Sequence, residues 1–278
     1  MSSRVFLIRH GETEGTRGME HISTTDHTLS TTGEKQVEVT REQYVGEGKL
    51  IDPKRASAAH FRRHHARENW KLKENSNTRY ITPRRRDRQT CEILRLGVHQ
   101  HQHFYDRTTK QTTTTAIPPV TGEIAEATIQ ITPSLGEWDY GEYEGLTTDQ
   151  IREKRRQGGL DKDSPWSIWE SGCPGGENPQ QVTDRLDELI REMREVLKST
   201  TASWPGGRMV PHVNEEPRDI VCVGSGQSLA ALAMRWVGLP LKCGVRLLFE
   251  TAGVAVLGFE DEDLNQPAII LGRMPVAR

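Results

Sequence analysis

A short segment near the N-terminus combines a histidine with residues that could make it a nucleophile. The apolar run Val5–Ile8 predicts a buried strand, and Arg9-His10-Gly11-Glu12-Thr13 follows at its end. A histidine directly after a buried strand is held rigidly, and a neighbouring arginine and glycine can form a pocket for an anion. The alternative is a loop histidine without any catalytic role.

A second segment carries a cluster of positive charge. Thr82–Thr90 lies at a predicted strand-to-helix transition and contains Arg84, Arg85, Arg86 and Arg88. Guanidinium groups there could hold a phosphate in a bidentate manner, with help from the start of the helix. A run of arginines is also typical of a solvated surface, and that alternative stays open for this segment by itself.

A third segment, Leu135–Gly145, places carboxylates beside aromatic residues and glycines. Burial in such surroundings raises the pKa of a carboxyl group, so Glu137 is a candidate general acid. Acidic loop residues facing water are the alternative. A nucleophilic histidine, an arginine clamp and an acid together form the complete set that moves a phosphoryl group through a covalent intermediate.

The elements that must position these segments alternate between strands and helices. After Val5–Ile8, strands are predicted at Arg79–Ile81, Ile129–Ile131, Ile220–Val223, Val245–Phe249, Ala252–Leu257 and Ala268–Leu271. Helices are predicted from Thr31 to about Gly46, at Gln89–Leu96, from Thr148 to about Gln157, at 179–198 and at Leu229–Val237. This order indicates an α/β three-layer sandwich, with a mainly parallel sheet and helices on both faces. Sites in such folds lie beyond the carboxyl ends of the strands.

Length and composition limit the class of protein. The 278 residues predict one domain, 1–278, with insertions at about 52–78 and 97–128; the low-complexity stretch 99–128 is expected to be mobile. A formal charge of -2 argues against a nucleic-acid partner, and no apolar stretch is long enough for a membrane span. The four cysteines lack metal-ligand or disulfide spacing, so a reducing cytoplasm is expected, and neither a metal nor a cofactor is predicted.

The three segments resemble the motifs of the histidine phosphatase superfamily, which includes the phosphoglycerate mutases. Arg9-His10-Gly11 matches its Arg-His-Gly motif, and the Glu137 loop matches its acidic motif. Its Ser-Pro-x-x-Arg-Ala-x-Gln-Thr segment is resembled by Thr82, Pro83, Arg86, Asp87, Gln89 and Thr90. Gly175-Gly176-Glu177 resembles a further signature, and residues 159–173 look similar to fungal sedoheptulose-bisphosphatase-type proteins.

The resemblance implies a phosphoglycerate mutase-like fold and a small-molecule substrate. His10 would become phosphorylated, Arg9 and Arg86 would neutralise the phosphoryl oxygens, and Glu137 would protonate the leaving oxygen. Residues expected to line the substrate site are Gly11, Thr13, Gly15, Arg84 and Gln227.

The sequence departs from the superfamily pattern after the strand Ile220–Val223. There the superfamily has a second catalytic histidine, and this chain has Ser225, with Gln227 and Ala230 replacing a following histidine and arginine. Serine donates one neutral hydrogen bond and cannot carry charge. Gly15, where larger residues are frequent, is expected to widen the pocket mouth.

Three hypotheses follow. The first is a cytoplasmic phosphomonoesterase acting on a sugar phosphate through phospho-His10. The second is a divergent biosynthetic enzyme (a lyase, isomerase or cyclase) that uses His10 and Glu137 as acid and base on a substrate without phosphate. The third is a sensor or scaffold that binds a phosphorylated ligand through Arg9 and Arg86. The oligomeric state is not predictable from the sequence.

Overall fold

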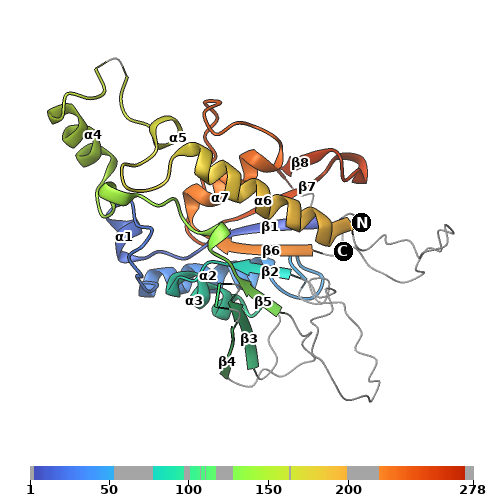
Figure 1. Cartoon of the computed structure of the whole chain (residues 1–278). Coiled ribbons are helices and arrows are strands. Elements are labelled where there is room, and N and C mark those ends of the chain that lie inside the picture. Colours follow the sequence, from blue (N-terminus) through green and yellow to red (C-terminus); the bar gives the residue numbers. More distant parts are fainter. Residues whose placement is uncertain are drawn as a thin grey trace.

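The strands of the described residues form one eight-stranded sheet between two layers of helices (Figure 1). The computed structural model describes residues 3–52, 78–96, 101–106, 108–109, 111–116, 128–162, 164–198 and 219–272. The strands are β1 (Arg4–Arg9), β2 (Thr78–Ile81), β3 (His101–Asp106), β4 (Gln111–Ala116), β5 (Thr128–Ile131), β6 (Asp219–Gly224), β7 (Val254–Phe259) and β8 (Pro267–Ile270).

The sheet is parallel at its centre and antiparallel at both edges. Its order is β4-β3-β5-β2-β6-β1-β7-β8, and the strands from β3 to β1 in this order run parallel. β4, β7 and β8 add antiparallel pairs at the edges. β1 and β6 are therefore neighbours whose carboxyl ends meet at one edge of the sheet, as the sequence predicts.

The side chains of β1 alternate between the two faces, as strand geometry requires. Val5 and Leu7 join the core cluster under α6 and α7, whereas Phe6 and Ile8 join the cluster under α2 and α3. The helices are α1 (Glu14–Arg17), α2 (Thr31–Tyr44), α3 (Arg85–Leu94), α4 (Thr148–Gln157), α5 (Ile168–Ser171), α6 (Pro179–Lys198) and α7 (Gly226–Trp236). This confirms the three-layer α/β sandwich.

The longest of these helices follows its sequence signals closely. α6 begins at Pro179, and the side chain of Asn178 accepts hydrogen bonds from the backbone N–H groups of Gln180 and Gln181. Its buried residues recur at helical spacing and form one apolar stripe: Val182, Leu186, Leu189, Ile190, Met193 and Leu197. An amphipathic helix with a side-chain cap needs little tertiary information to be predicted.

Two predictions about the elements are wrong. Val245–Phe249 is not a strand but an irregular segment that reaches Arg9 at the carboxyl end of β1, and its residues Leu247, Leu248 and Phe249 line a cavity instead of pairing in the sheet. The stretch 99–128, for which no strand was predicted, contains β3 and β4, which extend one edge of the sheet. Thr112–Thr115 are β-branched residues that favour extended backbone, and an edge strand can be polar because it does not need apolar residues on both faces. Most of the insertion predicted at 52–78 lies outside the described residues.

Candidate active site

His10 is held by one hydrogen bond from its backbone and one from its ring. It follows β1, its backbone N–H donates to the carbonyl of Gly224 at the end of β6 (3.0 Å), and its side chain is 3% exposed. The ring Nδ1 lies 2.7 Å from the carbonyl oxygen of Gly11. A carbonyl only accepts, so Nδ1 carries the hydrogen and Nε2 keeps its lone pair. Burial, with Arg86 and Arg9 nearby, lowers the pKa of His10 to about 3, which keeps the imidazole neutral and nucleophilic.

Gly11 is fixed by the close approach of α2. A Cβ at this position would lie 2.4 Å from the carbonyl oxygen of Gly33 and 2.9 Å from Cγ2 of Val37. The backbone N–H of Gly11 also donates to Oγ1 of Thr90 in α3 (3.3 Å). Gly11 therefore orients the ring of His10 and does not line the cavity that His10 faces.

Arg9 joins the end of β1 to the segment that crosses it. Its Nη1 donates to the carbonyl of Phe249 at 2.6 Å, whereas its Nε is buried without an acceptor among the described residues. Burial lowers the pKa of Arg9, and the nearby carboxylate of Glu137 opposes this shift. Gly226 permits the approach of Arg9, because a Cβ there would lie 3.2 Å from Nε.

Arg86 belongs to α3, and its orientation is fixed by hydrogen bonds to backbone carbonyls of the loop that follows α1. Its guanidinium donates to the carbonyls of Thr25 (3.0 Å) and Ser23 (3.4 Å), and the residue is only 2% exposed. The loop is held in turn by Glu144, whose carboxylate accepts from the backbone N–H groups of Ser23, Thr24 and Thr25 and from two hydroxyls. Glu144 is thus a positioning residue for Arg86.

Replacing Glu144 with alanine should destabilise this loop. We expect Glu144→Ala to lower the free energy of unfolding by about 2 kcal/mol, because several charge-assisted hydrogen bonds are lost at once. The matched control is Glu142→Ala: Glu142 is exposed and its carboxylate makes a 3.6 Å surface ion pair with Lys154, so its loss should cost less than about 1 kcal/mol. Urea denaturation of both variants measures the difference, and equal losses would contradict this role of Glu144.

Glu137 lies against the first turn of α7. Its carboxylate accepts from the backbone N–H groups of Ser228 (2.9 Å), Trp138 (2.9 Å) and Gln227 (3.2 Å). Burial nevertheless raises the pKa of Glu137 above its usual range, against these donors and the two arginines. Because Glu137 satisfies the start of α7, the Ser225 side chain is not needed as its cap.

Ser225 directly precedes α7 and is 3% exposed. Its Oγ is buried and has no hydrogen-bond partner among the described residues. Two residues further, Oε1 of Gln227 accepts from the hydroxyl of Tyr140 at 2.8 Å. Ser225, Gln227 and Tyr140 therefore place uncharged polar groups beside Glu137.

Asp87 follows Arg86 and adds a buried carboxyl group. It is fully buried, one carboxylate oxygen accepts from the hydroxyl of Thr82, and Oδ1 has no partner in the described part of the chain. Burial raises its pKa to about 6, although Arg86 opposes the shift. Near neutral pH, its charge partly offsets that of Arg86.

The sequence-predicted residues meet in one cavity of about 390 Å³ at the carboxyl end of β1 and β6. Of those residues, the cavity is lined by Arg9, His10, Thr13, Arg86, Glu137, Ser225 and Gln227. Gly11, Gly15 and Arg84 lie outside the lining. Gly15 does not widen the mouth, because a Cβ there would lie 2.7 Å from Cγ1 of Ile22, which fills that space and lines the cavity. Arg84 is the N-cap residue of α3 and is half-buried.

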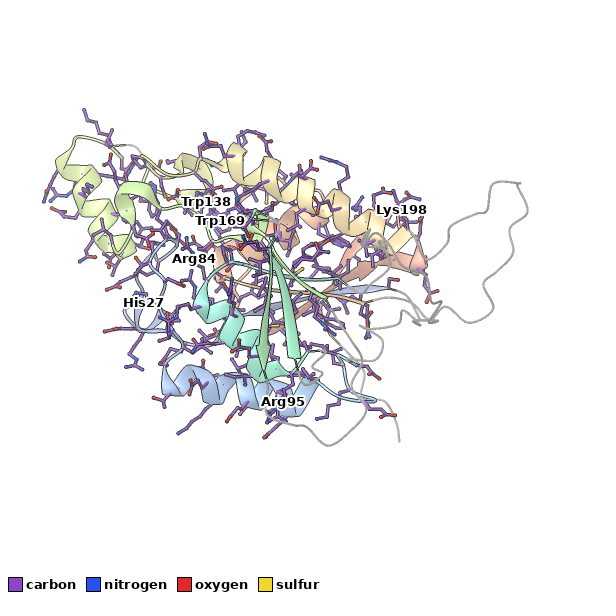
Figure 2. All side chains as sticks on the ribbon, turned by 60° about the horizontal axis from the view of Figure 1, so that its bottom comes forward. His27, Arg84, Arg95, Trp138, Trp169 and Lys198 are labelled. Atoms are coloured by element: carbon purple, nitrogen blue, oxygen red, sulfur yellow. The ribbon has the colours of Figure 1, made fainter. Side chains whose placement is uncertain are left out.

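Several residues that line the cavity were not predicted from the sequence. Tyr140, His21 and Trp169 form aromatic walls, and the segment Arg246–Phe249 forms another side. Trp169 meets Trp138 edge to face at 5.5 Å, and both are labelled in Figure 2. Tyr140 lies within the acidic segment and could have been singled out there, whereas His21, Trp169 and Arg246–Phe249 carry no motif of their own.

The described residues hold neither clustered metal ligands nor a long apolar helix. Within them, there is no group of three or more histidine, cysteine, aspartate or glutamate side chains arranged to hold a metal ion. No helix in the described part of the chain is long and apolar enough to cross a membrane. Cys91, Cys173, Cys222 and Cys243 are all free.

The fold and the motif residues define a known class of enzyme. The model of the histidine phosphatase superfamily (branch 1) matches residues 5–52 and 108–203, which include Arg9, His10 and Glu137. The chain belongs to this superfamily and is a phosphatase-like hydrolase by its relatives.

Two curated relatives cover nearly the whole chain. An acid phosphatase of Mycobacterium tuberculosis is 30% identical over 257 residues, covering 92% of this chain and 87% of its own. Sedoheptulose 1,7-bisphosphatase of Saccharomyces cerevisiae is 26% identical, with 98% and 93% covered.

The fold agrees with solved structures. That of an open reading frame of Mycobacterium tuberculosis has a TM-score of 0.61 at 27% identity, covering 98% of this chain and 97% of that one. A putative alpha-ribazole-5'-P phosphatase of Escherichia coli has a TM-score of 0.59 at 14% identity, covering 97% and 95%, and supports the fold alone.

Proposed function

We propose that this chain hydrolyses a small phosphomonoester through a phosphohistidine at His10. The observation that carries the proposal is that a neutral histidine, two arginines and a protonatable glutamate line one cavity. The relatives named as phosphatases support it. The free cysteines suit a reducing cytoplasm, where we place the enzyme.

The reaction needs two displacements at phosphorus. Nε2 of His10 attacks, the bond from phosphorus to the ester oxygen breaks, and Glu137 gives its proton to the leaving alcohol. Water then attacks the phosphohistidine and passes a proton back to Glu137 as the bond from nitrogen to phosphorus breaks. Arg9 and Arg86 stabilise the phosphoryl oxygens in both steps, so charge placement provides most of the catalysis.

Trapping the intermediate tests this proposal directly. Acid-free quenching of the enzyme with an aryl phosphate, followed by mass spectrometry, should show one phosphoryl group on His10. Hydrolysis indistinguishable from buffer, together with a folded chain and no phosphohistidine, would reject the phosphatase function.

The pH dependence provides a second test. Because His10 stays neutral down to about pH 3 and Glu137 acts in its protonated form, kcat/KM should rise as the pH falls below neutrality. The rise should approach tenfold per pH unit, roughly, until Glu137 is mostly protonated. A profile from about pH 8 to about pH 4.5 measures this after correction for ionisation of the substrate. A decline below about pH 6.5, where an ordinary histidine gains its proton, would contradict it.

The second candidate is a divergent biosynthetic enzyme that uses the same pocket for acid–base chemistry. Ser225 favours it, since its buried hydroxyl stands where the superfamily pattern has a histidine and cannot supply charge. Asp87 favours it too, because a carboxyl group beside Arg86 reduces the pull on a phosphate dianion. In that case His10 and Glu137 would exchange protons with a substrate that carries no phosphate.

A further inference from the structure

The outer part of the cavity is more apolar than its inner end, where the proposed catalytic groups lie. Of the proposed catalytic groups, His10 and Arg86 are buried and Arg9 and Glu137 are half-buried, whereas the remaining lining contains several large apolar side chains. These are Met19, Ile22, Trp169, Leu247, Leu248 and Phe249. They come from the loop after α1, from α5 and from the segment that crosses the end of β1.

Two of these apolar side chains are unusually open to solvent. Leu248 is 90% exposed and Met19 is 80% exposed, yet both line the cavity. Leaving large apolar side chains in water gains nothing for folding, and when they gather at a cavity they mark a surface that a ligand covers. Leu271 has a comparable exposure of 92% and does not line the cavity, which makes it a matched reference.

Positive charge is sparse in the outer part. Among the described lining residues beyond Arg9 and Arg86, Arg246 is the one arginine or lysine, and Glu20 carries the opposite charge. The guanidinium of Arg246 lies 5.6 Å from the ring centroid of Trp169, where it extends an aromatic wall. His21 is half-buried, and burial lowers its pKa, so it is neutral near pH 7.

These surroundings offer few donors that could bind a second phosphate group. Sites for phosphate typically use several arginine, lysine or backbone N–H donors, because the dianion must be compensated for lost water. Beyond Arg9 and Arg86, the described lining offers a second phosphate one arginine, Arg246, whereas Glu20 would repel it and the exposed leucine and methionine side chains cannot bind it. An apolar group gains by covering those side chains and carries no charge for Glu20 to repel.

We propose that the substrate is a monophosphate ester of a bulky apolar alcohol rather than a bisphosphorylated sugar. Its phosphate would lie at His10, and its apolar part would cover Leu248, Met19 and the ring of Trp169. This inference rests on the proposed phosphatase function for turnover, but recognition of the apolar part is measurable without turnover.

The kinetic test compares substrates that share the phosphate and differ in the alcohol. kcat/KM should be highest for 1-naphthylmethyl phosphate, lower for glycerol phosphate and lowest for fructose 1,6-bisphosphate, all of which release an alkyl alcohol. The double variant Met19→Ser/Leu248→Ser should raise KM for 1-naphthylmethyl phosphate about tenfold with kcat unchanged, and should change KM for glycerol phosphate by less than about twofold. Leu271→Ser should change neither constant. Preference for the bisphosphate, or an unchanged KM in the double variant, would overturn the proposal.

A binding experiment separates this inference from the phosphatase function. Calorimetry with 1-naphthylmethylphosphonate, which cannot be hydrolysed, should show binding that weakens about tenfold in the double variant and not in Leu271→Ser. If hydrolysis is absent but this pattern holds, the phosphatase function fails and apolar recognition stands. If the phosphonate does not bind, or binds both variants equally, the inference is wrong whatever the turnover.

Discussion

The variant His10→Ala should lose phosphatase activity by at least about 10³-fold, because the nucleophile of the covalent step is gone. The loss should fall on kcat rather than on KM, since Arg9 and Arg86 remain to bind the phosphate. Turnover of an aryl phosphate and trapping of phosphohistidine measure both parts of the expectation.

His27→Ala is the matched control. His27, labelled in Figure 2, is half-buried in a loop and is not among the residues that line the cavity. It should keep the activity of the unaltered chain, and thermal unfolding checks that both variants fold. Equal activity of His10→Ala and the unaltered enzyme would remove His10 from the mechanism and favour chemistry elsewhere.

The second large effect that we expect is a gain in phosphatase activity. Ser225→His should raise phosphatase kcat about 10²-fold, because it restores a donor that can carry charge beside the developing phosphoryl anion. The fold should accept the exchange: α7 begins with its N–H groups bonded to Glu137, and the serine hydroxyl makes no hydrogen bond with the described residues.

Ser225→Asn separates charge from size. Asparagine adds a neutral donor of intermediate volume and should give a much smaller gain than histidine. If histidine and asparagine raise kcat equally, shape and not charge limits the natural enzyme. If neither raises it, the buried carboxyl group of Asp87 is the next position to exchange, because it opposes Arg86.

Much of the fold was predictable because its signals are local. The continuous apolar run of β1 and the capped, striped helix α6 each determine their own structure within a short stretch. The meeting of Arg9, His10, Arg86 and Glu137 was predictable from motifs and from the rule that parallel strands bring their carboxyl ends together.

The parts that could not be predicted depend on long-range contacts. The role of Glu144 depends on backbone N–H groups of residues 23–25, more than a hundred residues earlier in the chain. Val245–Phe249 has the composition of a strand, but it pairs with no strand among the described residues, and Arg246–Phe249 forms one side of the cavity instead. The full burial of Asp87 could not be predicted, because in the sequence it lies within a run of charged residues that is typical of a surface.

The hydrogen bond from Arg9 to the carbonyl of Phe249 connects the inner end of the cavity, where His10 lies, to its apolar outer part. Phe249 adjoins the apolar residues Leu247 and Leu248, while Arg9 adjoins His10. In the proposed mechanism, a ligand that displaced this stretch of main chain would also move the guanidinium that binds the phosphoryl group. Such a ligand would lose rate as well as affinity, whereas side-chain exchanges at Met19 and Leu248 that leave the main chain in place should change affinity alone.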